Sequence, residues 1–257
     1  MATDVGGAAK PVLGYWNVRG LGAQLRYMLR YCEVDFEQEL YNQTFDDGAE
    51  GYDRWNRDEW FSVKFTKGLD FPNLPYFIDG DVRLTQSSAI ARYICAKWRP
   101  ELAGRTPADV GAAAMLEGKL SDLNSSLDKI AFFPDGTRER LQECMKNGLE
   151  PLRKYLGDKK YVLGDYVTFV DFILFEMIEK AQHEHIYDGK FFDVVDFAAY
   201  HATIAALPNM MSADERAKQG HFNGWRAKLG GAGEAMYRKY KKLDEPAAGG
   251  AAGGDGW

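Results

Sequence analysis

The stretch from 75 to 94 constrains the fold more than any other part of the sequence. The runs PYFID and DVRLT flank Asp79-Gly80, and this dipeptide between two strand-like runs is a strong signal for a β-hairpin. Ser87 or Ser88 can cap the helix that the following apolar spacing predicts. The sequence therefore predicts a hairpin that leads directly into a helix.

The segment before the hairpin predicts a strand, a helix and a second strand. VLGYW at 12–16 is a short apolar and aromatic strand candidate, and a second strand is expected over Phe36–Tyr41. Between them, apolar residues recur at helical spacing, at Leu21, Leu25, Met28, Leu29 and Cys32. A long charged loop over 42–67 follows, and loops of such length are often functional. The order predicts a small α/β domain with a mixed sheet.

From Pro107 onward the pattern is helical. One apolar stripe comprises Met115, Leu116, Leu120, Leu123 and Leu127, and another Leu141, Met145, Leu149 and Leu152. Thr168 to Asp171 reads as a capping box at the start of a further helix. We therefore expect an all-α domain, with the domain boundary near 98–106.

These patterns divide the chain into four parts: a flexible leader over 1–10, an α/β domain over 11–97, an all-α domain over 105–244 and a disordered Gly/Ala-rich tail over 245–257. The leader has no apolar core, so it does not read as a secretory signal. Three dispersed cysteines without a CxxC fit a reducing, cytoplasmic compartment.

Charge and hydropathy exclude other classes. The chain has 32 basic and 38 acidic residues, so nucleic acid is not an expected partner. No apolar run reaches 18 residues, so no membrane span is expected. The two histidines of His183-Glu184-His185 would face different sides of a helix, so we expect no metal site.

Four segments carry a resemblance to a known family. They are GYWNVRGL at 14–21, LDFPNLPYFIDG at 69–80, TQSSAIARYI at 85–94 and VTFVDF at 167–172. Together they are similar to cytosolic glutathione transferases, and to the mu class in particular. The resemblance covers roughly residues 11–180. It implies a thioredoxin-like N-terminal domain, a helical C-terminal domain, a homodimer and the conjugation of glutathione to electrophiles.

Conjugation requires a glutathione thiolate, whereas a thiol of ordinary pKa is only a few per cent ionised at neutral pH. A hydroxyl donor beside the sulfur can stabilise the thiolate. The resemblance implies that Tyr15 is this donor. The pattern alone also allows a tyrosine whose ring only packs between the domains.

The tripeptide's γ-glutamyl carboxylate needs its own site. Gln86 and Ser87 open a helix, where free backbone N–H groups and the helix dipole favour an anion. The resemblance implies that they bind this carboxylate, that the peptide before Pro75 is cis, and that the Leu74 backbone pairs with the glutathione cysteine, with Asn73 alongside.

The second carboxylate of glutathione, on its glycine, is assigned to the long loop. Arg57, Trp60 and Lys64 lie at i, i+3 and i+7, which puts them on one side of a helical turn. The resemblance implies that all three face this carboxylate. It also implies that Trp16 donates near the glutathione backbone and that Leu21 packs beside it.

The remaining predictions concern the partner subunit and the electrophile. The resemblance implies that Asp122 reaches the glutathione of the neighbouring subunit, and that Phe71 and Arg92 lie at the dimer interface. An apolar electrophile pocket is expected from Phe132 and Met115. The family's second tyrosine has no counterpart in Phe132-Phe133-Pro134. The divergent C-terminal region, with His221, Phe222 and Trp225, is expected to complete the pocket.

The reading that follows is a glutathione S-transferase that acts on hydrophobic electrophiles in detoxification. Glutathione is a co-substrate, and no cofactor or metal is expected. Two alternatives remain open at this stage: a glutathione-dependent isomerase or peroxidase, and a non-catalytic binding protein for apolar ligands.

Overall fold

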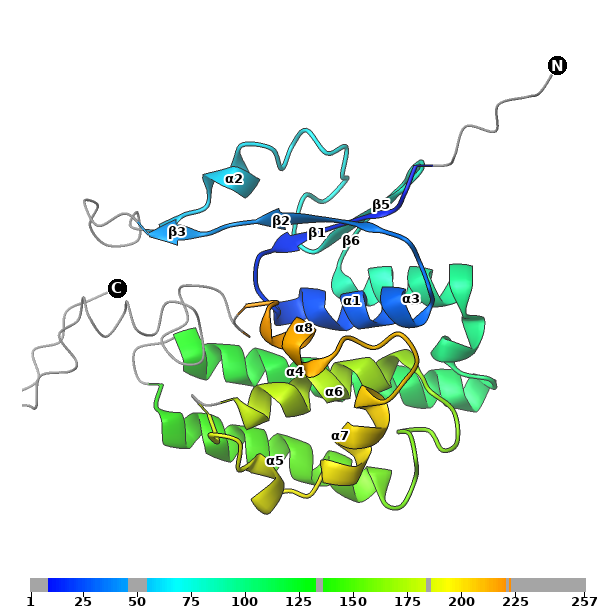
Figure 1. Cartoon of the computed structure of the whole chain (residues 1–257), viewed down its shortest axis with the longest axis vertical. Helices are drawn as coiled ribbons and strands as arrows, with labels where there is room; N and C mark the ends of the chain where they lie inside the picture. The colour runs from blue at the N-terminus through cyan, green and yellow to red at the C-terminus, as the bar shows by residue number, and fades with distance from the viewer. Residues whose placement is uncertain (1–8, 46–54, 133–135, 184–185, 221, 223–257) are drawn as a thin grey trace, which may run out of the picture.

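A mixed four-stranded sheet forms the first part of the molecule (Figure 1). The computed structural model describes residues 9–45, 55–132, 136–183, 186–220 and 222. The elements of the first part are β1 (Val12–Trp16), α1 (Gly20–Tyr31), β2 (Glu37–Tyr41), β3 (Thr44–Phe45), β4 (Trp55–Asn56), α2 (Asp58–Phe61), β5 (Tyr76–Asp79), β6 (Val82–Thr85) and α3 (Ser87–Trp98).

The strand order is β2-β1-β5-β6, with β1 parallel to β2 and antiparallel to β5. β5 and β6 form the predicted hairpin, in which Asp79 pairs with Val82 and Gly80 adopts a φ of +59°. A positive φ is the usual requirement of a two-residue hairpin turn. The predicted α/β domain with a mixed sheet is therefore confirmed. The segment over 42–67 was predicted to be a long loop, but it contains three short elements, β3, β4 and α2.

The second part of the molecule is helical, as predicted. Its elements are η2 (Pro100–Ala103), α4 (Pro107–Phe132), α5 (Arg138–Leu156), α6 (Phe169–Gln182), η3 (Phe191–Asp193), α7 (Ala198–Ala205) and α8 (Ala213–Ala217). Figure 1 shows α1 and α3 between the sheet and these helices, whereas α2 lies on the other side of the sheet. The helical part therefore packs on α1 and α3 and not directly on the sheet.

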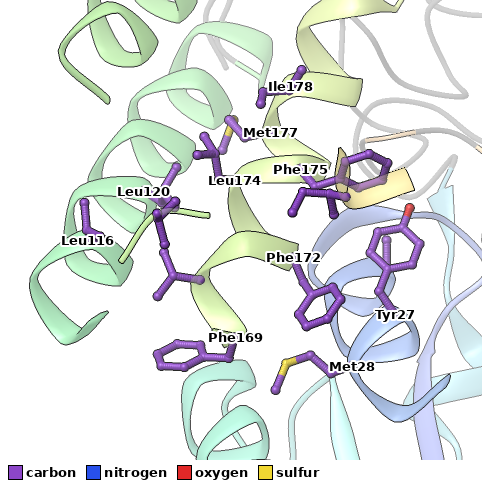
Figure 2. Close-up of a cluster of buried hydrophobic side chains, with 14 of the residues drawn as sticks. Tyr27, Met28, Leu116, Leu120, Phe169, Phe172, Leu174, Phe175, Met177 and Ile178 are labelled. Carbon is purple, nitrogen blue, oxygen red and sulfur yellow. The ribbon is translucent and has the colours of Figure 1, made fainter. Parts of the chain in front are cut away.

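Helix α6 is the centre of the core because it is apolar on most sides. Figure 2 shows its aromatic side chains between Tyr27 and Met28 of α1 and the leucines of α4. The rings of Tyr27 and Phe175 meet edge to face, with centroids 5.7 Å apart. This packing fixes α6, and the polar residues that α6 carries, relative to the first part of the molecule.

The start of α6 is held by the predicted capping box. The buried Asp171 carboxylate accepts hydrogen bonds from the Thr168 N–H at 2.8 Å and from the Val162 N–H at 2.9 Å. Orphan donors at a buried helix start need such partners. The box therefore ties the preceding loop to the helix.

Several predictions fall outside the described residues. They concern residues 1–8 of the leader, the tail over 245–257, Phe133, Pro134, Glu184, His185, His221 and Trp225. Within the described residues, no helix combines the length and the apolar character needed to cross a bilayer. The same residues contain no group of three or more His, Cys, Asp or Glu side chains suited to a metal ion.

Candidate functional site

A cavity of about 590 Å³ lies between the two parts of the molecule, within the usual size range of small-molecule sites. We call the residues from β1, the start of α1, the long loop and the start of α3 the sheet-side wall. We call the residues of α4 and α6 that face it, with Phe222, the helical wall. The predicted site residues that line the cavity are Tyr15, Trp16, Leu21, Arg57, Gln86, Ser87 and Phe132.

Tyr15 ends the buried part of β1 and projects its hydroxyl to the cavity. The phenol oxygen accepts a hydrogen bond from the Leu21 N–H at 3.0 Å. Gly20 makes this approach possible, because a Cβ there would come within 2.6 Å of the Tyr15 oxygen. Burial raises the pKa of Tyr15, an effect that the Leu21 N–H opposes. The group is therefore a neutral phenol at physiological pH, with its own hydrogen still to donate.

The start of α3 differs from the sequence prediction. Neither Ser87 nor Ser88 caps the helix: Gln86 is the N-cap residue, with φ of +72° and no side-chain capping bond, and Ser87 is the first helical residue. A positive φ in a residue with a side chain is uncommon and is often found at functional sites. The outcome is that the first N–H groups of α3 are left without a side-chain cap beside the cavity.

Of the three predicted ligands in the long loop, Arg57 alone lines the cavity. Trp60 is buried, with its ring 5.8 Å from that of Tyr76 and 5.2 Å from that of Tyr41. The Lys64 ammonium lies over the rings of Phe61 and Phe65. The three side chains were expected to point to the same side of a helical turn. They do not, because the short α2 ends at Phe61, before a second turn could align Lys64 with Arg57.

The Trp60 indole N–H is nevertheless available. Among the described residues nothing accepts a hydrogen bond from it, and no fully buried side-chain nitrogen or oxygen there lacks a partner. The N–H therefore reaches the protein surface while the ring stays in the core.

The segment before β5 has the predicted backbone form, since the Leu74–Pro75 peptide is cis. The Asn73 side-chain oxygen accepts a hydrogen bond from the Leu74 N–H at 2.9 Å. Neither residue is part of the cavity lining. In the structure, the Leu74 backbone, which was predicted to pair with the glutathione cysteine, therefore has its N–H hydrogen-bonded to the Asn73 side chain.

The helical wall is more polar than the sequence analysis predicted. Phe132 lines it as expected, but Met115 does not: its side chain is 58% exposed on another face of α4. The predicted electrophile pocket therefore differs from the structure in two ways: Met115 does not line it, and its wall is not uniformly apolar. Apolar residues do contribute, yet the wall also contains Ser121, Asn124, Ser125, Asp128 and Lys180. The signal was present in the sequence as polar residues at helical spacing between the leucines of α4.

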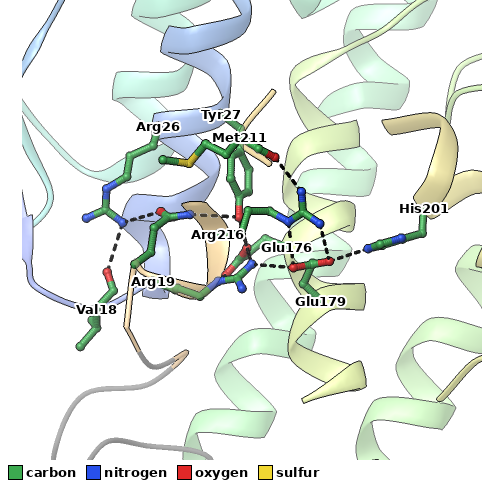
Figure 3. A network of polar contacts seen from close by, with 10 residues as sticks. Val18, Arg19, Arg26, Tyr27, Glu176, Glu179, His201, Met211 and Arg216 are labelled. Atoms are coloured by element: carbon green, nitrogen blue, oxygen red, sulfur yellow. Dashed lines mark hydrogen bonds and ion pairs between the residues drawn. The ribbon is translucent and has the colours of Figure 1, made fainter. Parts of the chain in front are cut away.

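A buried polar network that sequence reasoning missed joins the two walls (Figure 3). Arg19 donates to both oxygens of Glu176, from Nε at 2.9 Å and from Nη2 at 2.6 Å. The Tyr27 hydroxyl donates to Glu176 at 2.9 Å. Glu179, one turn further along α6, is contacted by Arg19, by Arg216 and by His201, the last at 2.5 Å. Such buried charges are tolerated because each has a counter-charge.

Phe222 closes the end of the helical wall, as expected for the C-terminal region. The Arg19 guanidinium lies 4.0 Å from the centre of its ring. The Phe222 carbonyl accepts a hydrogen bond from the Gly20 N–H at 3.1 Å. The start of α1 therefore holds this residue through its backbone and through its side chain.

The residues assigned to a second subunit lie on the surface. Phe71 is 76% exposed, and Asp122 is exposed on α4. Arg92 pairs with Glu117 through two contacts, at 3.0 and 2.5 Å. Their roles at an interface stay predictions, since they require a partner chain.

Comparison with known proteins identifies this architecture. The family described as "Glutathione S-transferase, N-terminal domain" matches residues 11–96, and "Glutathione S-transferase, C-terminal domain" matches residues 121–212. A glutathione S-transferase of Tyrophagus putrescentiae is 38% identical over 175 residues, which are 67% of this chain and 76% of the relative. Human "Glutathione S-transferase Mu 2" is 38% identical over 172 residues, covering 66% and 75%.

Other relatives extend the same picture. The class-mu 26 kDa isozyme of Schistosoma japonicum is 39% identical over 173 residues, 66% of this chain and 72% of the relative. Among solved structures, that of the glutathione S-transferase Blo t 8 is 26% identical, with a TM-score of 0.68, and covers 85% of this chain and 99% of its own.

Proposed function

This chain belongs to the glutathione S-transferase family, with mu-class relatives, and is an enzyme of that activity; on that premise we propose that Tyr15 stabilises the glutathione thiolate. One observation carries the proposal. The Tyr15 oxygen is already engaged as an acceptor by the Leu21 N–H at 3.0 Å, so its hydrogen is free to donate to a sulfur in the cavity. The thiolate then attacks an electrophile held against the helical wall.

The protonation state of Tyr15 supports this role. A thiolate is stabilised by a hydrogen-bond donor, and each unit by which the thiol pKa falls corresponds to about 1.36 kcal/mol. Burial raises the pKa of Tyr15, so the phenol remains protonated while the weaker base, the sulfur anion, accepts its hydrogen bond. Tyr15 thus acts as a donor throughout and not as a general base.

We assign the two glutathione carboxylates to opposite ends of the sheet-side wall. The γ-glutamyl carboxylate lies at the start of α3, where Gln86, Ser87 and the uncapped N–H groups favour an anion. The glycyl carboxylate lies toward the long loop, where Arg57 lines the cavity and the indole N–H of Trp60 has no other acceptor among the described residues. Lys64 contributes long-range positive charge.

The middle of the tripeptide occupies the space between these ends. Trp16 and Leu21 line it, and the Leu74 backbone pairs with the glutathione cysteine once Asn73 gives up its hydrogen bond to the Leu74 N–H. This exchange replaces one hydrogen bond by another. It therefore costs little in free energy compared with burying a backbone group unpaired.

We further propose a homodimer that works in the cytoplasm. The exposed aromatic ring of Phe71 and the position of Arg92 beside the small residues of α4 suit an interface between copies. Asp122 would then reach the glutathione amine of the neighbouring subunit.

The test is the pKa of the bound thiol in the wild type and in Tyr15→Phe. We expect the variant to bind glutathione with nearly unchanged affinity, to raise the thiol pKa, and to lose about 10²- to 10³-fold in turnover, as for the loss of one oxyanion donor. Ultraviolet absorbance of the thiolate gives the pKa directly. Tyr155→Phe, at a partly exposed tyrosine of α5, is the matched control. An unchanged thiol pKa in Tyr15→Phe would remove Tyr15 from the mechanism.

A further inference from the structure

The helical wall contains a buried ammonium group in a pocket that was expected to be apolar. Lys180 of α6 lines the cavity, and only 5% of the residue is exposed. Lysine is rarely buried to this extent unless it is paired. Its Nζ donates to the Asn124 side-chain oxygen at 3.3 Å and lies 3.7 Å from an Asp128 carboxylate oxygen.

Asn124 and Asp128 fix the direction of this ammonium. They lie one turn apart on α4, and the Asn124 side-chain N–H donates to Asp128 at 3.0 Å. The amide is therefore oriented with its oxygen toward Lys180. An ammonium has three N–H donors, and these two contacts leave a third. Both α4 residues and Lys180 line the cavity, so the ammonium and the two groups that orient it belong to the cavity wall.

This cluster lines the same cavity as Tyr15, from the opposite wall. Phe132, one turn beyond Asp128 on the same helix, lines the same wall and has no hydroxyl to offer. Lys180 is thus a hydrogen-bond donor on the electrophile's side of the cavity.

We propose that Lys180 is a catalytic residue that donates a hydrogen bond to an oxygen of the electrophile, as in the addition of the thiolate to a conjugated carbonyl compound. This inference rests on the proposed role of Tyr15, since it needs a thiolate as the attacking group. It replaces the expectation of a purely hydrophobic electrophile. The apolar residues Leu120, Ile173 and Met177 of the same wall would hold the carbon skeleton.

The reaction is a conjugate addition. The thiolate forms a C–S bond at the β-carbon. The π-electron pair of the C=C bond becomes the new double bond between the α-carbon and the carbonyl carbon, and the π-electron pair of the C=O bond moves to oxygen, which gives an enolate. The Lys180 ammonium, pre-oriented by Asn124 and Asp128, stabilises the developing oxyanion. The α-carbon then takes a proton from water, which balances the proton that left the thiol. No electron acceptor or donor is needed.

Two substrates separate this role from a structural one. An α,β-unsaturated ketone develops charge on oxygen, whereas a benzyl chloride develops charge on the departing chloride. We expect Lys180→Met to lower kcat/KM for the ketone by about 10- to 100-fold and to leave the benzyl chloride within about threefold. Lys180→Gln, of similar size but with a neutral N–H donor, should retain more of the ketone activity than Lys180→Met. Lys129→Met, at an exposed lysine outside the cavity lining, is the charge-matched control.

Equal losses for both substrates would overturn the proposal, because they would show that Lys180 only maintains the wall. So would equal ketone rates for the Gln and Met variants. Failure of the thiolate mechanism looks different: Tyr15→Phe would leave both substrates unaffected. A lowered ketone-to-benzyl-chloride ratio in Lys180→Met alone therefore tests the inference separately from the mechanism on which it rests.

Discussion

The sheet-side wall and the helical wall of the cavity present their polar groups by different means. On the sheet-side wall they are at the ends of elements: Tyr15 where β1 ends, and backbone N–H groups where α3 begins at Gln86. On the helical wall they are side chains carried by the turns of two helices, such as Asn124 of α4 and Lys180 of α6. One wall is thus determined by backbone geometry and the other by side-chain choice.

The difference matches the ligand that we propose for each wall, glutathione on the sheet-side wall and the electrophile on the helical wall. Glutathione is the same molecule in every turnover, so its contacts can be built into a backbone that is fixed by the sheet. The electrophile is the variable partner, and a helix can change one contact without altering its own backbone. The Arg19–Glu176 pair crosses from one wall to the other, so the two are not independent. Three predictions test how far the division holds.

The largest effect is expected for the Arg19–Glu176 pair, which links the two walls. Glu176→Ala leaves the Arg19 guanidinium, which is 4% exposed, with the neutral Tyr27 hydroxyl at 2.9 Å and with Glu179, at 3.2 Å, as its remaining counter-charge. Removing one partner of a buried pair costs about 3–5 kcal/mol. Urea denaturation at a fixed protein concentration measures the free energy of unfolding. Glu176→Gln, which keeps an acceptor, should lose clearly less. Equal stability of wild type and Glu176→Ala would mean that the walls are held together by apolar packing alone.

An intermediate effect is expected in the pH dependence of stability. Glu179 is partly buried, which opposes ionisation, but the His201 hydrogen bond and the Arg19 and Arg216 charges lower its pKa to about 2. Because this folded-state value is below the unfolded value of 4.5, the stabilisation is complete above about pH 4.5 and is lost as the pH falls toward 2.

The matching experiment compares wild type with Glu179→Gln in urea titrations from pH 7 to pH 3. The difference in unfolding free energy should be constant near neutral pH, on the order of 1–3 kcal/mol, and should shrink below pH 4.5. Glu150→Gln, at an exposed position of α5, serves as the control with no such trend. A difference that stays flat to pH 3 would contradict a lowered pKa.

The smallest effect is expected on the sheet-side wall. Trp60→Phe keeps the ring between Tyr41 and Tyr76 but removes the indole N–H. Loss of one hydrogen bond to a carboxylate should weaken glutathione binding by about 1–2 kcal/mol, or roughly 5- to 30-fold in Kd. Isothermal titration calorimetry measures this, with Trp98→Phe, outside the cavity lining, as the control. An unchanged Kd would exclude Trp60 as a ligand of the glycyl carboxylate.

Local sequence signals were sufficient where a short segment determines its own geometry. The Asp79-Gly80 hairpin and the Thr168–Asp171 capping box are both present in the structure, as is the cis peptide before Pro75 that the family resemblance implied. Each depends on a few adjacent residues, so a motif contains most of the relevant information. The start of α3 was less predictable, because a serine that can cap a helix can equally be its first residue.

Contacts between distant segments were beyond the sequence signals. The apolar stripe of α4 included Met115 next to Leu116, and spacing alone could not show that only the second of these is buried. Lys180 is separated from Asn124 by 56 residues and Glu176 from Arg19 by 157. A charged residue in such a pair looks like any surface charge until the fold brings its partner to it.

The Arg19–Glu176 pair also has a consequence for the order of events during synthesis. Translation completes the strands and helices of the first domain long before Phe169–Gln182 is made. Until then, the α1 surface that α6 covers, with Tyr27 and Met28, has no partner, and Arg19 has no counter-charge. The domain that contains Tyr15 therefore reaches its final form only after most of the chain has left the ribosome.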